Sequence, residues 1–223
     1  MTHQNPLRRL QQLGQSLWLD YIERGFVTSG ALANLINDDG VSGLTSNPAI
    51  FYKAITEHRE YAEAIGELAR SKLAAHEIYE ALVIEDIRKA ADALTDIYDR
   101  TGGRDGFVSL EVSPRFARDT EGTYWEAKRL WALVNRKNLM IKIPGTREGI
   151  PAVRCLTAEA ININVTLLFS VERYAAVADA FATGLEQRVT MNQPVDGIAS
   201  VASFFLSRID TLVDQRQIGR AHV

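Results

Sequence analysis

The chain has 223 residues, of which 46% are apolar and 24% charged, and its 28 acidic and 25 basic side chains give a formal net charge of −3. This composition is typical of one globular domain and provides no basic surface for nucleic acid or an anionic membrane. No apolar run approaches the roughly 18 residues that a bilayer span needs. Cys155 is the only cysteine, and the polar opening segment lacks the apolar core of a signal peptide, which predicts a cytoplasmic protein.

Short runs rich in β-branched and aromatic residues alternate along the chain with longer segments of helical period, as in repeated β-α units. Residues 56–100 contain no proline and one glycine, and they predict an excursion of two helices between the second and third strands. Residues 120–136 and 171–189 have the apolar spacing of helices that cover a sheet. The six predicted strands lie at residues 16–22, 41–47, 107–113, 139–144, 163–170 and 201–207.

Six such units fit either an open doubly wound sheet or most of a (β/α)8 barrel, which typically takes about 250 residues. The phosphate-binding patterns GxGxxG and GxxxxGK[ST] are absent. Their absence favours the barrel and removes the commonest cofactors, so we expect no cofactor. The four histidines, His3, His58, His76 and His222, lack zinc-ligand spacing, and we expect no metal.

Polar residues interrupt strands that should be apolar on both faces. In LMIKIP, the two-residue period of a strand places Ile141 and Ile143 toward the helices and Lys142 toward the barrel axis. Taken singly, such residues have an ordinary explanation, such as an exposed edge. Together, a buried Lys, Glu and Asp would cost several kcal/mol of desolvation, which favours a functional cluster. The same alternation predicts that Asp20, Glu111, Asn164 and Thr166 point inward with Lys142.

This set of side chains has the chemistry of a Schiff-base enzyme. Desolvation disfavours the ammonium form of a lysine on an apolar wall, and the free amine attacks a carbonyl. Glu111 is the candidate acid/base that works through a water held by Thr166, and Asp20 can take the proton of the hydroxyl beside the breaking C–C bond. Asn47 and Asn164 can hydrogen-bond sugar hydroxyls, although Asn47-Pro48 fits a helix start equally well.

Four segments carry a resemblance to a known family: GLTSNPAIF (43–51), SLEVSP (109–114), NLMIKIPGT (138–146) and INVTLLFS (163–170). In this order along the chain they resemble transaldolases of the longer bacterial type, and the similarity runs from about residue 5 to about residue 217. The resemblance implies an α/β fold, the (β/α)8 TIM barrel of the class I aldolase type. It also implies transfer of a dihydroxyacetone unit from a ketose phosphate, sedoheptulose 7-phosphate or fructose 6-phosphate, to an aldose phosphate in the non-oxidative pentose phosphate pathway.

Carried over residue by residue, the resemblance assigns roles to the polar cluster. Lys142 resembles the Schiff-base lysine, Glu111 the carboxylate that acts through water, Asp20 the aspartate acid/base and Thr166 the residue that positions the water. The remaining residues resemble substrate contacts: Asn47, Asn164 and Ser203 at the dihydroxyacetone moiety, and Arg208 at the phosphate.

The resemblance also predicts an incomplete barrel. The family has two further strands after VASFFLSRID and a second phosphate-contacting arginine on them. The last six residues, IGRAHV, match no family segment and are what ATC GGA AGA GCA CAC GTC encodes, the read-through of a common sequencing adaptor. We therefore expect residues 1–217 to form a truncated barrel with about six of eight β-α units and poor activity, and residues 218–223 to be a non-biological tail.

Two other functions remain open at this point. A simple class I aldolase would share the lysine but release its enamine to a proton, so it would form product without an acceptor aldose; Glu111 favours the transferase, because the small aldolases that resemble this family carry a different residue there. An inactive fragment would at most bind sugar phosphate through Arg208 and the asparagines, and imine trapping would separate it from both enzymes. The sequence leaves the oligomeric state open.

Overall fold

The computed structural model describes residues 5–218. The strands are β1 (Leu17–Asp20), β2 (Val41–Thr45), β3 (Val108–Glu111), β4 (Leu139–Pro144), β5 (Ile163–Leu168) and β6 (Ser200–Phe204). The longer helices are α1 (Pro6–Gln12), α4 (Pro48–Glu57), α5 (Ala62–Arg70), α6 (Ala75–Arg100), α7 (Thr120–Val134), α8 (Gly149–Ala158), α9 (Val171–Thr190) and α10 (Leu206–Ile218). Short turns of helix are α2 (Arg24–Thr28), α3 (Ala31–Asn34), η1 (Leu35–Asp39), η2 (Arg59–Tyr61) and η3 (Pro114–Phe116).

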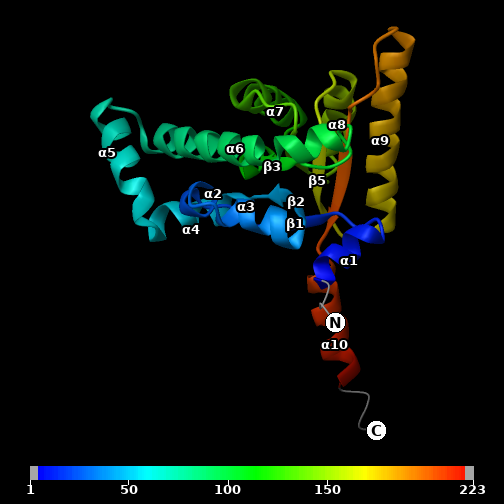
Figure 1. Cartoon of the computed structure of the whole chain (residues 1–223). Helices are drawn as coiled ribbons and strands as arrows, with labels where there is room; N and C mark the ends of the chain where they lie inside the picture. The colour runs from blue at the N-terminus through cyan, green and yellow to red at the C-terminus, as the bar shows by residue number, and fades with distance from the viewer. Residues whose placement is uncertain (1–4, 219–223) are drawn as a thin grey trace.

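All six predicted strands form, and they build one parallel sheet in the order β1-β2-β3-β4-β5-β6. Each crossover connection therefore leads to the adjacent strand, always on the same side of the preceding one. Because such crossovers are right-handed, the helices are placed on one face of the sheet, whereas a doubly wound sheet would reverse its order. The curved sheet with its layer of helices is the (β/α) barrel type that the sequence predicted, and it contains six units (Figure 1).

The core lies between the sheet and this helical layer. β4 is buried along its whole length, and Ile141 and Ile143 have no exposed surface. They pack with apolar residues of α6, α7 and α8, including Leu94, Val134 and Val153. The alternation predicted for β4 is therefore confirmed on its helix-facing side.

The predicted helical excursion is confirmed and contains α5 and α6, with η2 and the end of α4 ahead of them. A separate small core of Ala54, Tyr61 and Leu82 joins α4, η2 and α6, and Ile65 and Leu68 of α5 pack against it. We call α4, η2 and α5 the arm. In Figure 1, α5 lies at the end of this arm, away from the sheet. No described helix combines the length and apolarity that a membrane span requires.

β4 has the predicted bounds, whereas β1, β2, β3 and β5 each end two residues earlier than predicted. Two further details differ. The alternation in the fifth strand places Leu167 on the buried face, but Leu167 has a positive φ of 61° and is 41% exposed, and the register with β6 shifts between Val165 and Leu168. Leu168, after this bulge, takes the place in the core between sheet and helices that the alternation predicted for Leu167. The sixth strand, predicted to reach residue 207, ends at Phe204, because Leu206 already begins α10.

α10 extends away from the sheet in Figure 1, and its described side chains are exposed. Of the predicted tail at residues 218–223, residues 219–223 lie outside the described part of the chain. The origin of that tail stays a prediction.

Candidate active site

Lys142 lies at the middle of the sheet with only 5% of its surface exposed. Strand pairing places it between Glu111 on β3 and Asn164 on β5. Its Nζ is 3.5 Å from Glu111 Oε2 and donates a hydrogen bond to the Ser46 carbonyl oxygen at 3.2 Å. The apolar surroundings predicted for Lys142 are therefore only partly present. Its neighbours along the strand, Ile141 and Ile143, are apolar, whereas its amine contacts the Glu111 carboxylate and the Ser46 carbonyl oxygen.

Glu111 is the acid/base candidate with a shifted pKa. Burial raises the pKa of the Glu111 carboxyl above its ordinary value, the positive charge of Lys142 opposes this, and the negative charge of Asp20 adds to it. A carboxyl with a raised pKa can take up and release a proton closer to neutral pH than an exposed one. Asp20, in contrast, is exposed at the end of β1, so the prediction of a buried aspartate is wrong: β1 is an outer strand of the sheet, and in the described residues no further strand pairs with its outer side. A direct contact of Asp20 with Glu111 or Lys142 stays a prediction.

Asn164 is held by hydrogen bonds on both sides. Its Nδ2 donates to Ser109 Oγ at 2.9 Å, and Ser203 Oγ donates to its Oδ1 at 2.8 Å. The structure therefore brings Asn164 and Ser203 together, as the sequence predicted. The sequence analysis did not predict a role for Ser109. Strand alternation could have done so, because Ser109 lies two positions before Glu111 and therefore points to the same side of the strand.

Three buried threonine hydroxyls have no hydrogen-bond partner within the described residues; Thr157 lies on α8, and the other two lie on strands. Thr166 Oγ1 lies on β5, at the position paired with Pro144 of β4, and Thr45 Oγ1 lies on β2, opposite Asp20. A buried hydroxyl without a partner is a group that can hold a water or a substrate hydroxyl. For Thr166 this fits the predicted role. Thr45 was not predicted, because threonine is an ordinary residue in a strand.

Asn47 is the N-cap of α4. Its Oδ1 accepts a hydrogen bond from the Ile50 backbone N–H at 3.0 Å, and Pro48 occupies the first helical position. The structure thus bears out the helix-start explanation. Asn47 also lines a cleft of about 680 Å³ at the ends of β2 and β3, which Glu111 and Ser113 border as well. A substrate contact by Asn47 stays a prediction.

Arg208 lies apart from the cluster in the interactions that the structure shows. It is an exposed residue of α10, and its guanidinium sits over the Phe205 ring, 4.5 Å from the centroid. None of the described ion pairs or hydrogen bonds connects its side chain with Lys142, Glu111 or Asn164. Its predicted phosphate contact is therefore untested.

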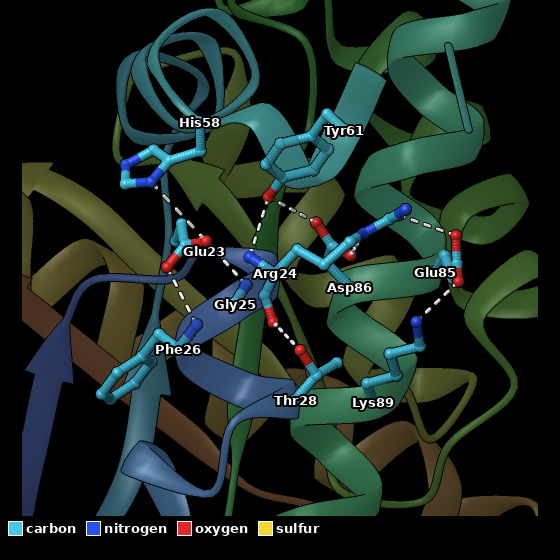
Figure 2. Close-up of polar contacts among 10 residues, drawn as sticks. All are labelled: Glu23, Arg24, Gly25, Phe26, Thr28, His58, Tyr61, Glu85, Asp86 and Lys89. Carbon is cyan, nitrogen blue, oxygen red and sulfur yellow. Dashed lines mark hydrogen bonds and ion pairs between the residues drawn. The ribbon is translucent and has the colours of Figure 1, made fainter. Parts of the chain in front are cut away.

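One group of side chains has ligand types that a metal ion could use. Atoms of Glu23, His58 and Glu60 all lie within 4.8 Å of one another. Glu23 already has a structural role, however: its carboxylate accepts the Gly25 and Phe26 N–H groups and caps α2 (Figure 2). His58 Nδ1 lies 3.8 Å from Glu23 Oε1. The group is explained by this cap and contact, and the expectation of no metal stays a prediction.

Comparison with known proteins matches this arrangement to one family. A model of the family described as Transaldolase/Fructose-6-phosphate aldolase matches residues 17–222. The transaldolase of Thermobifida fusca (strain YX) is 51% identical over 212 residues, which are 95% of this chain and 58% of that protein. The transaldolase of Thiobacillus denitrificans is 49% identical over 215 residues, 96% of this chain and 60% of that protein.

The chain thus spans about three fifths of the length of these curated relatives. The family model, in contrast, covers nearly the whole chain, and its match includes the strands that carry Asp20, Glu111, Lys142 and Asn164. From this match, the chain belongs to the Transaldolase/Fructose-6-phosphate aldolase family.

Proposed function

We propose that this chain carries the Schiff-base chemistry of a transaldolase, which moves a dihydroxyacetone unit from a ketose phosphate to an aldose phosphate in the non-oxidative pentose phosphate pathway. The observation that supports it most directly is the buried Lys142 beside Glu111, with Nζ 3.5 Å from Oε2. The Glu111 carboxyl, whose pKa burial raises, is the group within reach that can accept a proton from Lys142 during the reaction.

The chemistry follows from the groups at hand. The Lys142 amine attacks the ketose carbonyl carbon, and the carbinolamine loses water with Glu111 as acid/base through a water held by Thr166. Asp20 removes the proton from the hydroxyl on the carbon β to the imine carbon, and the bond between the α- and β-carbons breaks. The β-carbon leaves as the aldehyde of a shorter aldose phosphate, and the bonding electrons enter the imine to form an enamine. The enamine then attacks the acceptor aldehyde, which takes back the proton from Asp20, and hydrolysis frees Lys142.

We further propose that Asn164 and Ser203 contact the dihydroxyacetone hydroxyls, together with Asn47 at the cleft. The hydrogen bonds that link Asn164 to Ser109 and Ser203 support this, because they fix the amide at the side of Lys142. Arg208 is the proposed phosphate contact. A cytoplasmic location and the lack of a nucleic-acid or membrane partner are proposals from the composition alone.

A simple aldolase is the second candidate, because the family description names both activities. Glu111 favours the transferase, because the small aldolases that resemble this family carry a different residue at this position. The measurement that separates the two is product formation with and without an acceptor aldose. A transaldolase needs the acceptor.

The direct test is imine trapping in a completed chain, which we define as residues 1–217 followed by the C-terminal segment of the Thermobifida fusca relative. Borohydride with fructose 6-phosphate should attach a three-carbon unit to the peptide that contains Lys142. Lys142→Ala should abolish the label, whereas the matched control Lys137→Ala, at an exposed lysine that pairs with Asp99, should keep it. A label that persists in Lys142→Ala would refute the assignment.

A further inference from the structure

The cleft beside Glu111 extends outward from the sheet, between α4, α6 and α7. Its wall on α6 includes Tyr79, a half-buried residue that packs against the main core. Tyr79 therefore shares one cavity with the carboxyl that contacts Lys142. The other charged or titratable groups around the cleft are Tyr52 on α4, His76, Glu77 and Glu80 on α6, Arg115 on η3, and Glu126 and Arg129 on α7.

The charge of Glu111 influences the Tyr79 hydroxyl. Burial raises the pKa of the Tyr79 hydroxyl, the negative charge of Glu111 raises it further, and no hydrogen bond from a described residue contributes. The hydroxyl therefore stays protonated at neutral pH and keeps its hydrogen available as a donor. Glu111 itself faces Lys142 on β4 and the charge of Asp20 on β1.

Arg129, the strongest donor on the cleft wall, is already occupied. Its guanidinium pairs with Glu80, with one contact at 2.7 Å, and with Glu126 at 2.9 Å. Tyr79 is a neutral donor in the wall of the cleft that Glu111 also lines, as are Asn47, Tyr52 and Ser113, and it lies on a helix that packs against the main core. Of these four, Tyr79 is the residue whose hydroxyl the Glu111 charge influences. A cleft of about 680 Å³ with polar groups in its wall has room for water, which occupies about 30 Å³ per molecule.

We propose that Tyr79 is a positioning residue for Glu111: its hydroxyl donates to a water in the cleft, and that water donates to Glu111 Oε1. Oε2 is the oxygen that contacts Lys142, so the two oxygens have separate partners. The water-mediated bond holds the carboxyl in the orientation that faces Lys142. It also stabilises the ionised form, which limits the effect of burial. The role in turnover rests on the proposed transaldolase activity, whereas the contact itself does not.

The test is a carbon-13 NMR titration of the glutamate carboxyls in the 223-residue chain, with the Glu111 signal identified by its loss in Glu111→Gln. Tyr79→Phe removes the donor and keeps the ring, so the pKa of Glu111 should rise by about half a unit to one unit. The matched control is Tyr52→Phe, which removes a hydroxyl from the α4 side of the same cleft and should leave the pKa of Glu111 unchanged. Equal values in Tyr79→Phe and the unmodified chain, or equal shifts in both variants, would overturn the proposal.

A reciprocal titration keeps the proposal testable if Tyr79→Phe folds poorly. Removing the charge in Glu111→Gln should lower the pKa of Tyr79, followed through its ring carbon signal; an unchanged value would refute the coupling. In the completed chain, Tyr79→Phe should move the acid limb of the pH profile of kcat/KM to higher pH, with little change in KM. When Glu111 is already replaced by Gln, adding Tyr79→Phe should not change kcat/KM further. Failure of imine trapping with the NMR shift present would refute the activity alone, and the reverse result would refute the Tyr79 contact alone.

Discussion

Lys142 and Glu111 are the two residues whose charges are least accessible to water in the site, with side-chain exposures of 6% and 14%. Each compensates the charge of the other, and loss of one partner leaves the other buried and unpaired. The position of the pair is fixed by strand register, since Glu111 and Lys142 are direct neighbours across β3 and β4. Single substitutions at the site therefore test chemistry and stability together, and conservative ones are the most informative.

Glu111→Gln keeps the shape of the side chain and removes its ability to exchange a proton. In the completed chain, kcat should fall by about 10²-fold or more with KM little changed, because general acid–base catalysis contributes that much to turnover. Steady-state kinetics measures this, with Glu57→Gln on the exposed side of α4 as a control that should retain full kcat. A raised KM at constant kcat would assign Glu111 to substrate binding instead.

Gly43 on β2 is required by its neighbour Trp18. A Cβ at Gly43 would lie 2.4 Å from the Trp18 ring, whose Nε1 donates to Ser16 Oγ at 2.8 Å. Gly43→Ala should lower the free energy of unfolding by about 1–3 kcal/mol, as overpacking does in well-packed cores. Urea denaturation can compare it with Gly66→Ala inside α5, where the nearest atom is 3.8 Å away and a gain of about 0.5–1 kcal/mol is expected. Equal effects at both glycines would contradict this explanation.

Among the elements, α6 connects the site to the arm of α4 and α5. It contributes Tyr79 to the cleft and, about two helical turns further along, the fully buried Asp86. Tyr61 OH donates to Asp86 Oδ2 and Arg24 Nε donates to Oδ1, both at 2.8 Å (Figure 2). Because Arg24 begins α2, directly after the loop from β1, this buried network joins α2, η2 and α6.

Asp86→Ala should therefore destabilise the chain strongly, by about 3–5 kcal/mol. It leaves the largely buried Arg24 with the exposed Glu85 as its remaining carboxylate and removes the acceptor of the buried Tyr61 hydroxyl. Asp92→Ala on the same helix removes an ion pair to Arg136 whose side chains are 55% and 34% exposed, and it should cost less than about 1 kcal/mol. The comparison of unfolding midpoints at neutral pH is the measurement. Similar losses from both substitutions would show that the Asp86 network is not the main connection between these elements.

At the scale of the whole molecule, the six strands form a curved sheet whose two outer strands, β1 and β6, do not pair with each other in the described residues. The β6 side is also poorly covered: Phe204 is 43% exposed and Leu206 is 62% exposed. Unpaired strand edges and exposed apolar side chains favour association between molecules.

The 223-residue chain alone should consequently turn over little substrate, although the residues around Lys142 are in place. A closed barrel pairs its first and last strands and excludes water from its interior, and both conditions strengthen the electrostatic interactions on which the lysine depends. The measurement is turnover of the 223-residue chain beside that of the completed chain, together with light scattering to detect aggregation. Comparable turnover of the two would contradict this view.

Local patterns in the sequence were sufficient to locate the strands and to assign their inward-facing residues. The two-residue period of β-strands, which acts between near neighbours, placed Glu111, Lys142 and Asn164 on one side and Ile141 and Ile143 on the other. The same rule was wrong at Leu167, because a bulge changes the register of one strand relative to its partner, and that partner lies elsewhere in the chain. Asn47 remained ambiguous for a similar reason, since a cap and a substrate contact use the same residue type.

Contacts between distant parts of the chain depended on the fold. Ser46 meets Lys142 across 96 positions, Arg24 meets Asp86 across 62, and Tyr79 meets the cleft of Glu111 only because α6 packs beside β3. No local pattern predicts these pairs, since they arise when the sheet order sets which elements are neighbours and burial forces each charged group to find a partner. Residue type and periodicity therefore determined which groups face the barrel interior, and strand order and helix packing determined which of those groups touch.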